Sequence, residues 1–317
     1  MIYDCFIFNN ELDLLDIRFN VMNRITDRFV LVESQKNFQG KDKPLYFEEN
    51  KERYSQFLDK VIHIVVKDFG TPCPIDWDCE KIQREYILDG LKDANDDDII
   101  IISDCDEIPN PNTVLKCMNQ PEIKSLRQFN YQYYLNNLAV GRTCTEEQTS
   151  KILFMKDIRN NILGAENGII NTIKFNHGTK QTIIPDGGWH FTSCGNIEIV
   201  KEKLLSNSFH ENETVEIRMD LIKNHDYYKN LKFLWNVQQP LIPLILDSHF
   251  PEYIRKNRKK FSHMLKRAYI NYDTVMLLYT VFRKLRYLAA HIIRFFVKNP
   301  EKREQLLTKL FSYRQIG

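Results

Sequence analysis

The chain has no long hydrophobic run and no cysteine pattern typical of a metal-binding module. None of its 317 residues lies in a stretch of about 18 consecutive apolar residues, the length that a membrane-spanning helix needs. Its seven cysteines are scattered, without a CxxC pair or a Cys/His cluster at zinc spacing. We therefore expect no spanning helix and no structural zinc, and mostly free, buried thiols in a reducing compartment.

The sequence also lacks a start typical of a signal peptide, internal repeats and low-complexity linkers. It opens directly on a strand-like run, Tyr3 to Phe8, instead of a charged segment followed by a long apolar one. Hydrophobic residues make up 43% and charged residues 27%, ordinary values for a folded protein. These features favour a cytoplasmic enzyme.

Charge is distributed unevenly along the chain. Residues 251–317 carry 16 Lys and Arg against 4 Asp and Glu, whereas the preceding 250 residues carry 28 against 38. The overall net charge of +2 hides this difference. Two regions of such different charge are expected to face different partners.

Strand and helix patterns alternate over the first 110 residues. The strand-like runs are Ile2–Phe8, Phe29–Glu33, Val61–Val66 and Ile99–Ile102, with helical spacing from Glu11 and from Cys79 to Leu91. This order predicts an α/β fold with a doubly wound sheet. Farther along, Phe129–Leu135 alternates as an antiparallel strand does, so the central sheet is expected to be mixed. Ligands bind beyond the carboxyl ends of such strands, where Asn10, Glu33 and Asp104 fall.

The most informative segment is IIIISDCDEIPNP, from Ile99 to Pro111. It places Asp104 and Asp106 directly after a buried strand, so both carboxylates can approach one hard cation such as Mn²⁺ or Mg²⁺. Such an ion on a diphosphate would neutralise the charge that develops as a sugar leaves. The alternative is that Asp104 caps the turn and Asp106 is solvated.

Phosphatases of the haloacid dehalogenase type also place Asp-x-Asp after an apolar strand. Their motif lies near the N-terminus and continues with Thr or Val and a Gly-Thr-Leu-like run. Here the motif follows three earlier strands and continues Glu107-Ile108-Pro109. The phosphatase chemistry is therefore the weaker alternative.

Several motifs together resemble glycosyltransferase family 17. They are FIFNNELDLLDIRFN (6–20), FVLVES (29–34), GKDKPLYF (40–47), QREYI (83–87), IIIISDCDEIPNP (99–111) and GGWHF (187–191). The resemblance covers about residues 1 to 235. It implies a GT-A type nucleotide-sugar-binding domain, a UDP-sugar donor with N-acetylglucosamine as the leading sugar, Mn²⁺ or Mg²⁺, and inversion at the anomeric carbon.

The chain departs from that family in two places. The segment Ser206-Asn207-Ser208-Phe209-His210-Glu211 has altered spacing relative to bacterial members, so no role passes to His210 or Glu211 by analogy. The basic tail after about Tyr253 is not part of the family pattern.

Other residues are predicted to bind the donor. Glu33 ends a strand and would accept hydrogen bonds from ribose or uracil, unless it is a solvated loop acid. Asn10 and Glu11 would line the same pocket, although helix capping explains them equally well. Arg84 and, more weakly, Lys43 would bind phosphate, with pairing to a neighbouring acid as the alternative for Arg84.

The GGWHF motif supplies a third metal-ligand candidate, His190, whose alternative is a satisfied core histidine. Trp189, Tyr133 and Tyr134 could stack on sugars, but core packing is their commoner role. An inverting transfer also needs a base for the acceptor hydroxyl. The candidates for the base are Glu107, Asp186 and Glu211, with Glu107 the first to mutate.

We therefore predict a GT-A domain over residues 1–250 and a basic helical extension over 251–317. The expected reaction moves a sugar from a UDP-sugar to a hydroxyl of a glycan or lipid-linked glycan, and no nucleic-acid partner is expected. The main alternative is an inactive nucleotide- or sugar-binding module.

Within the extension, residues 275–297 form an amphipathic helix with a basic polar face. This helix would lie on an anionic membrane, making the enzyme peripheral. The alternatives are packing on the domain or oligomerisation.

Overall fold

Four parallel strands form one half of a seven-stranded sheet in the computed structural model. β1 (Ile2–Phe8) lies between β2 (Arg28–Ser34) and β4 (Ile99–Asp104), and β3 (Val61–Val66) pairs with β2. All four were expected from their apolar runs. The structure describes residues 1–37, 40–70, 78–143, 149–160, 168–175, 180–195 and 241–311.

The other half of this sheet is mixed. β9 (Lys151–Phe154) runs antiparallel to β4 and is followed by β6 (Ile123–Leu126) and β10 (Gln181–Ile184), which gives the order β10-β6-β9-β4-β1-β2-β3. The predicted α/β class with a mixed central sheet is confirmed.

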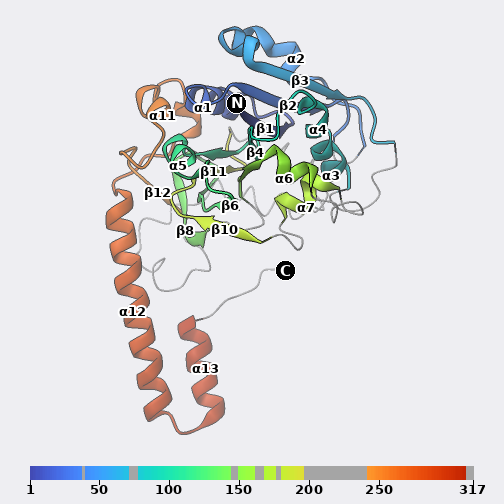
Figure 1. Ribbon diagram of the computed structural model, residues 1–317. Helices are drawn as coiled ribbons and strands as arrows, with labels where there is room; N and C mark the ends of the chain where they lie inside the picture. Colours follow the sequence, from blue (N-terminus) through green and yellow to red (C-terminus); the bar gives the residue numbers. More distant parts are fainter. Residues whose placement is uncertain are drawn as a thin grey trace.

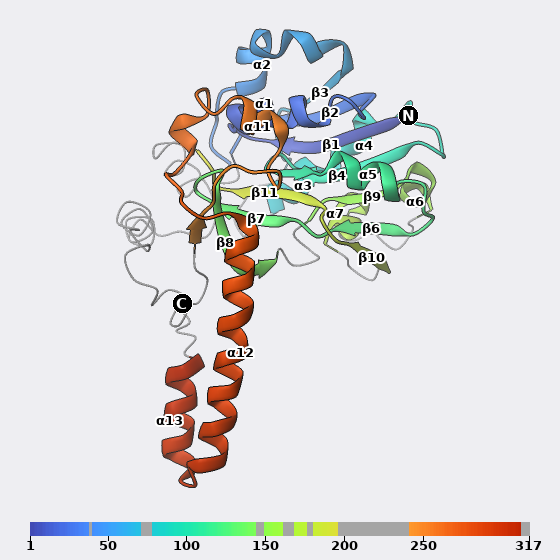
Figure 2. The same cartoon turned by 90° about the vertical axis from the view of Figure 1, so that its left-hand side faces the viewer.

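Both faces of the sheet are buried, which explains why β4 is apolar at successive positions. Ile99 and Ile101 belong to one core cluster, whereas Ile100 and Ile102 belong to the other. The first cluster includes α1 (Leu12–Met22), and the second includes residues from α4 (Ile87–Gly90) and α7 (Ile169–Lys174). Helices cover the sheet in Figures 1 and 2.

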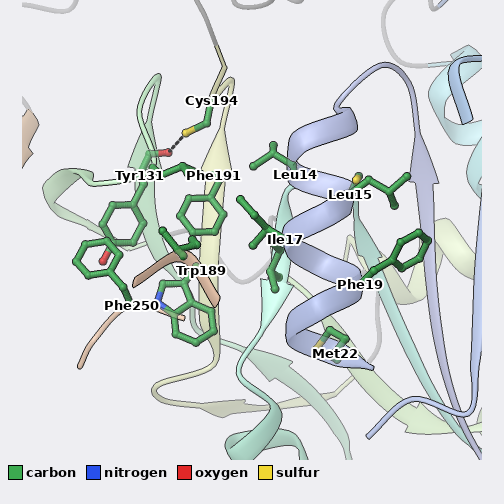
Figure 3. Close-up of a cluster of buried hydrophobic side chains, with 14 of the residues drawn as sticks. Leu14, Leu15, Ile17, Phe19, Met22, Tyr131, Trp189, Phe191, Cys194 and Phe250 are labelled. Carbon is green, nitrogen blue, oxygen red and sulfur yellow. Dashed lines mark hydrogen bonds between the residues drawn. The ribbon is translucent and has the colours of Figure 1, made fainter. Parts of the chain in front are cut away.

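A second, five-stranded sheet continues from the end of β4. Its order is β12 (Leu241–Pro243), β8 (Asn137–Thr143), β7 (Phe129–Gln132), β11 (Gly188–Thr192) and β5 (Glu107–Pro109). Helix α1 packs against it, and Figure 3 shows Leu14 and Ile17 pointing toward Phe191.

Two expected elements differ from the sequence pattern, one because it is divided and the other because it is shorter. The helix expected from Cys79 to Leu91 is divided at Tyr86 into α3 (Asp78–Glu85) and α4. The strand expected to reach Leu135 ends at Gln132, because Tyr133 adopts a positive φ of 66°. The remaining elements are α2 (Tyr46–Asn50), the 3₁₀ segment η1 (Lys51–Lys60), α5 (Pro111–Cys117), α6 (Met155–Arg159), α11 (Glu252–Lys256) and η5 (Ser262–Met264).

The C-terminal part consists of a packed segment and a projecting one. Ile254, Phe261 and Met264 belong to the main core, so the core extends past the boundary predicted at residue 250. Beyond them α12 (Tyr272–Phe296) leaves the domain, and α13 (Pro300–Phe311) runs back alongside it (Figures 1 and 2). Among the helices described, none is long and apolar enough to cross a membrane.

The cysteines only partly match the expectation of free thiols. Cys5, Cys105, Cys117 and Cys194 are free and buried, whereas Cys79 is disulfide-bonded. Cys73 and Cys144 lie outside the described residues.

Candidate active site

Asp104 ends strand β4 beside two buried cations. Its Oδ1 lies 3.0 Å from Nη2 of Arg84, and its Oδ2 lies 4.0 Å from Nζ of Lys174. Burial alone would raise the pKa of Asp104, but the charges of Arg84 and Lys174 outweigh it and hold the pKa well below its usual range. The Asp104 side chain is 30% exposed, so this anionic group remains within reach of a ligand.

Asp106 lies across from His190. Strand β5 begins just after Asp106 and pairs antiparallel with β11, which places His190 opposite Glu107. The backbone N–H of Phe191 donates to the carbonyl of Asp106 at 2.9 Å, and His190 Nε2 lies 3.6 Å from Asp106 Oδ1. The structure thus brings together the two motifs, DCDE and GGWHF, that hold the three predicted metal ligands.

Gly188 makes this strand pairing possible, and Gly187 lets the chain before β11 pass close to β6. Gly188 has φ 126°, and a Cβ atom there would lie 2.2 Å from the carbonyl oxygen of Ile108. A Cβ on Gly187 would lie 2.7 Å from the backbone carbonyl carbon of Leu126. Only glycine lets β11 approach β5 this closely, and that approach sets the position of His190.

Glu107 is buried in an ion pair. The carboxylate is 1% exposed, and both of its oxygens lie 2.6 Å from Nζ of Lys174 on α7. Its Oε2 also accepts the backbone N–H of Asp104 at 3.1 Å. A carboxylate with these partners lacks the access to an acceptor hydroxyl that a base needs. Its surroundings therefore fit a structural role better than the predicted catalytic one.

Arg84 is fully buried and committed to protein groups. Besides Asp104 it contacts Glu80 and Asn171, with Nη1 of Arg84 2.9 Å from Oδ1 of Asn171. Burial raises the pKa of the Glu80 carboxyl. The positive charge of Arg84 acts to lower this pKa, and the negative charge of Asp104 acts to raise it further. The structure thus shows the pairing with acids that was the alternative to phosphate binding, because α3 packs against β1, β2 and α7 and directs Arg84 to the end of β4.

Arg18 and Asp4 also belong to the site, although neither was predicted from the sequence. Both are completely buried: Arg18 Nη2 lies 2.5 Å from Asp4 Oδ1, and Nη1 donates to the carbonyls of Asp104 (2.9 Å) and Glu107 (3.0 Å). Arg18 therefore fixes the backbone of the turn that carries Asp106. The signal was available, because Asp4 is a charged residue inside an otherwise apolar strand, which calls for a buried partner.

The predicted donor residues near β1 and β2 lie together, but most of them contact one another. Glu33 is fully buried, accepts the backbone N–H of Phe47 at 3.0 Å and lies 3.2 Å from Nε2 of His63. It is neither a solvated loop acid nor open to a ribose, because the segment containing α2 covers the end of β2. Lys43 lies 4.0 Å from Glu33 and donates to the carbonyl of Asn9 at 3.3 Å.

Asn10 differs from its neighbours. Its side chain does not cap α1, and its Oδ1 atom is buried without a hydrogen-bond partner among the described residues. Glu11 accepts the backbone N–H groups of Asn9 and Asn10 at 3.1 Å each and so braces this turn. Asn10 keeps an unused acceptor at the carboxyl end of β1, beside the strand that ends in Asp104.

The remaining candidates lie away from this centre. Trp189 is 8% exposed and donates to the carbonyl of His249, as a core residue does. Asp186 is exposed near Asn110, at the far end of the β5–β11 pair from Asp106. Tyr134 packs beside Lys266, and Tyr133 occupies the turn after β7. His210 and Glu211 lie outside the described residues.

Comparison with known proteins identifies the family. The model of glycosyltransferase family 17 matches residues 1–226, which include the DCDE and GGWHF motifs. The chain belongs to glycosyltransferase family 17. The family match ends before α11 and the projecting helices, and the resemblance seen in the sequence is confirmed.

The chain is also similar to curated members of this family. It is 25% identical over 291 residues to the β-1,4-mannosyl-glycoprotein 4-β-N-acetylglucosaminyltransferases of Rattus norvegicus and Homo sapiens. The alignments cover 82% of this chain but 54% of each relative, so the chain spans about half the length of the curated relatives it matches.

Solved structures match more weakly. A 4-diphosphocytidyl-2C-methyl-D-erythritol synthase aligns with TM-score 0.36 and 13% identity over 69% of this chain and 98% of its own. The 2-C-methyl-D-erythritol 4-phosphate cytidylyltransferase of Francisella tularensis aligns with TM-score 0.35 and 11% identity over 68% and 97%.

Proposed function

We propose that this family 17 chain is a metal-dependent glycosyltransferase. In this proposal it transfers a sugar, with N-acetylglucosamine as the first choice, from a UDP-sugar to a hydroxyl of a glycan or lipid-linked glycan, with inversion. The sugar and the glycan acceptor are taken from the names of the relatives, whereas the lipid-linked acceptor is carried over from the expectations of the sequence. The supporting observation is that Asp106 and His190 face each other at 3.6 Å beside Asp104.

The donor atoms fit Mn²⁺ or Mg²⁺. Two ligand atoms that are each about 2.1 Å from one ion lie roughly 3 to 4 Å apart, depending on their angle, and the distance between Asp106 and His190 falls in this range. Among the described residues no group of three or more His, Cys, Asp and Glu side chains forms a ready metal site. Mg²⁺ sites with one or two carboxylates completed by substrate phosphates are common, so this geometry is compatible with a site completed by the donor.

Acidic groups also gather around this turn. Glu80 and Asp104 lie beside Arg84, Glu107 lies beside Lys174, and Asp106 lies beside His190. Carboxylate oxygens such as those of Asp104 and Asp106 are ligands that a hard dication prefers.

Each residue then has a distinct part in donor binding. Asp106 and His190 would hold the ion, with Asp104 beside them, and Asn10 Oδ1 would accept a hydrogen bond from the nucleoside at the neighbouring strand end. The ion supplies Lewis-acid stabilisation of the departing diphosphate. Arg18, Arg84 and the pair of Glu107 and Lys174 keep the carboxylates in place.

The positions of the candidate bases relative to Asp106 distinguish among them. Glu107 is enclosed with Lys174, and Asp186 lies at the far end of the strand pair, roughly 10 Å or more away from His190 by strand geometry. Neither position suits proton removal from an acceptor beside Asp106. Glu211 is the third candidate named from the sequence.

Donor hydrolysis tests the function. We expect slow release of UDP from UDP-N-acetylglucosamine with Mn²⁺, and at least a hundredfold loss in Asp104→Asn and Asp106→Asn, since the metal-bound charge stabilisation is removed. The matched control is Asp97→Asn, an exposed acid on the turn before β4, whose side chain is 88% exposed.

The result also separates the enzyme from an inactive binding module. A folded protein that binds UDP-sugars but releases no UDP, with water or with a panel of glycan acceptors, is a binding module. Full turnover of both variants in EDTA would show that the metal-centred mechanism is wrong.

A further inference from the structure

Helix α12 carries an uncovered apolar stripe. From Leu277 to Phe295 the exposed apolar side chains recur at intervals of three or four residues, and with Phe296 they lie within about 100° of one another around the helix axis. They are Leu277, Val281, Leu285, Leu288, Ile292, Phe295 and Phe296. Phe295 and Phe296 are 78% and 73% exposed, which leaves two aromatic rings in water at the end of the helix.

Among the residues that the structure describes, neither those of the domain nor those of α13 cover this stripe. Val275 and Ala290 are the residues of α12 that are buried, and at 100° per residue Ala290 lies roughly on the opposite side of the helix from the stripe. Figures 1 and 2 show α12 projecting from the domain with α13 along one side of it. The apolar face thus stays exposed although the helix has two neighbours.

Basic residues occupy much of the remaining helix surface. From Thr274 to Asn299 the sequence contains Arg283, Lys284, Arg286, Arg294 and Lys298 but no Asp or Glu. Arg283, Lys284 and Arg294 are exposed; Lys284 lies next to the stripe, whereas Arg283 and Arg294 lie on the side of Ala290. A helix with an apolar face and a basic one has the character of a helix that lies in the headgroup plane of an anionic membrane.

We propose that the hairpin of α12 and α13 binds an anionic lipid surface. The stripe enters the boundary between headgroups and acyl chains, and the exposed Arg and Lys side chains of the polar face bind the anionic headgroups. The hairpin lies on the membrane instead of crossing it, since no described helix has the length and hydropathy to span one. This surface is separate from glycosyl transfer and stands without it.

A second copy of this chain is the rival occupant. The positions Val281, Leu285, Leu288, Ile292 and Phe295 follow the alternating steps of four and three residues seen in coiled coils. Helix pairing would then bring Lys284, which lies next to the stripe, close to the same residue of the second copy, and α12 carries no acid beyond Asp273 to pair with it. Repulsion between these charges disfavours self-association, whereas the same charges favour anionic lipid.

The attachment of α12 to the domain is well defined. Tyr272 stacks near Phe129 and His249, with ring centroids 5.2 and 4.5 Å apart, and the carbonyl of His249 accepts the indole N–H of Trp189. Trp189 adjoins His190. The hairpin therefore begins against Phe129 of β7 and against His249, which in turn contacts the strand that carries a proposed metal ligand, so membrane binding would orient the site relative to the lipid surface.

Vesicle flotation of the full chain tests the proposal. We compare vesicles of phosphatidylglycerol and phosphatidylcholine in equal parts with vesicles of phosphatidylcholine alone, at low salt and at about 0.5 M salt. The first variant carries Leu288→Ser and Ile292→Ser, and the second carries Arg283→Gln and Lys284→Gln. The matched control is Leu115→Ser, an exposed leucine on α5 of the domain that is 44% exposed.

We expect flotation with the anionic vesicles only, weakened by salt. The stripe variant should bind at least about tenfold more weakly because apolar burial is lost. The charge variant should bind on the order of tenfold to thirtyfold more weakly, and the Leu115 control should bind as the parent does.

Two results would overturn the proposal. One is a parent chain that stays in solution with anionic vesicles at low salt, or a stripe variant that floats as the parent does. The other is a dimer in light scattering that the stripe variant converts to a monomer while neither protein binds vesicles, which would assign the stripe to a second copy of the chain.

Discussion

The carboxylate of Glu107 and the ammonium of Lys174 form a buried ion pair in which both carboxylate oxygens lie 2.6 Å from Nζ. Glu107 also accepts the backbone N–H of Asp104, so the pair connects α7 to the turn that carries the acidic motif. Glu107 can therefore have one of two roles. It can position the acidic turn through its enclosed ion pair, or it can act as the base, which would need access to the acceptor hydroxyl.

The first prediction separates these two roles. We expect Glu107→Gln and Lys174→Met each to lower the free energy of unfolding by about 3 kcal/mol, since each leaves a buried charge without its partner. The double variant should lose much less than the sum of the two, which a urea-unfolding cycle measures. If Glu107→Gln abolished turnover with unchanged stability and unchanged Mn²⁺ affinity, Glu107 would be the base after all.

The second prediction concerns Arg18. Replacing it by Met should destabilise the protein by about 3 to 5 kcal/mol, because Asp4 is left charged and buried. Adding Asp4→Asn should restore part of the stability but not the Mn²⁺ affinity, because the carbonyls of Asp104 and Glu107 still lack their donor. Recovery of full metal affinity in the double variant would show that Arg18 acts on stability alone.

The third prediction concerns Gly188. We expect Gly188→Ala to cost more than about 3 kcal/mol, since it combines a strained φ with overlap of the Ile108 carbonyl. Gly40→Ala is the matched control: its φ is 76°, but no atom lies within 4 Å of the added Cβ, so strain alone should cost about 1 kcal/mol. Thermal unfolding measures both, and equal losses would contradict the close approach of β11 to β5.

The fourth prediction concerns the nucleotide. UDP should bind at least tenfold more tightly than GDP, about 1.4 kcal/mol, in calorimetry with Mn²⁺. Asn10→Ala should reduce UDP affinity, because its unused Oδ1 atom lies at the end of β1. Tighter binding of GDP would refute the UDP-sugar assignment, and unchanged UDP affinity in Asn10→Ala would remove Asn10 from the pocket.

Local patterns in the sequence were sufficient for the alternating first half of the fold. The apolar runs of β1, β2, β3 and β4 are short and are separated by polar turns or a helical period, so each predicts its element without knowledge of its neighbours. The Ile run of β4 also indicated burial on both faces, and the structure places one face in each core cluster. The acidic motif was found in the same way, because a strand followed by Asp-x-Asp is a local feature.

The partners of the site residues depended on contacts between distant segments. Glu33 pointed to a nucleotide pocket by its strand-end position, yet residues around Phe47 fold over it and enclose it. Arg84 looked suited to phosphate, yet helix packing directs it to Glu80 and Asp104. Spacing along the chain carries no information on which side chain, 20 or more residues away, satisfies a buried charge.

The sequence by itself determined strands β1 to β4, the acidic turn and the basic amphipathic helix, because each follows from residue types that are close together along the chain. Only the tertiary structure decided that Arg18 holds the acidic turn, that Lys174 neutralises Glu107 and that His190 faces Asp106. It also decided that the apolar stripe of α12 is uncovered. The physical reason is that burial and charge pairing are properties of the packed chain. Each depends on residues that are close in space but distant along the sequence.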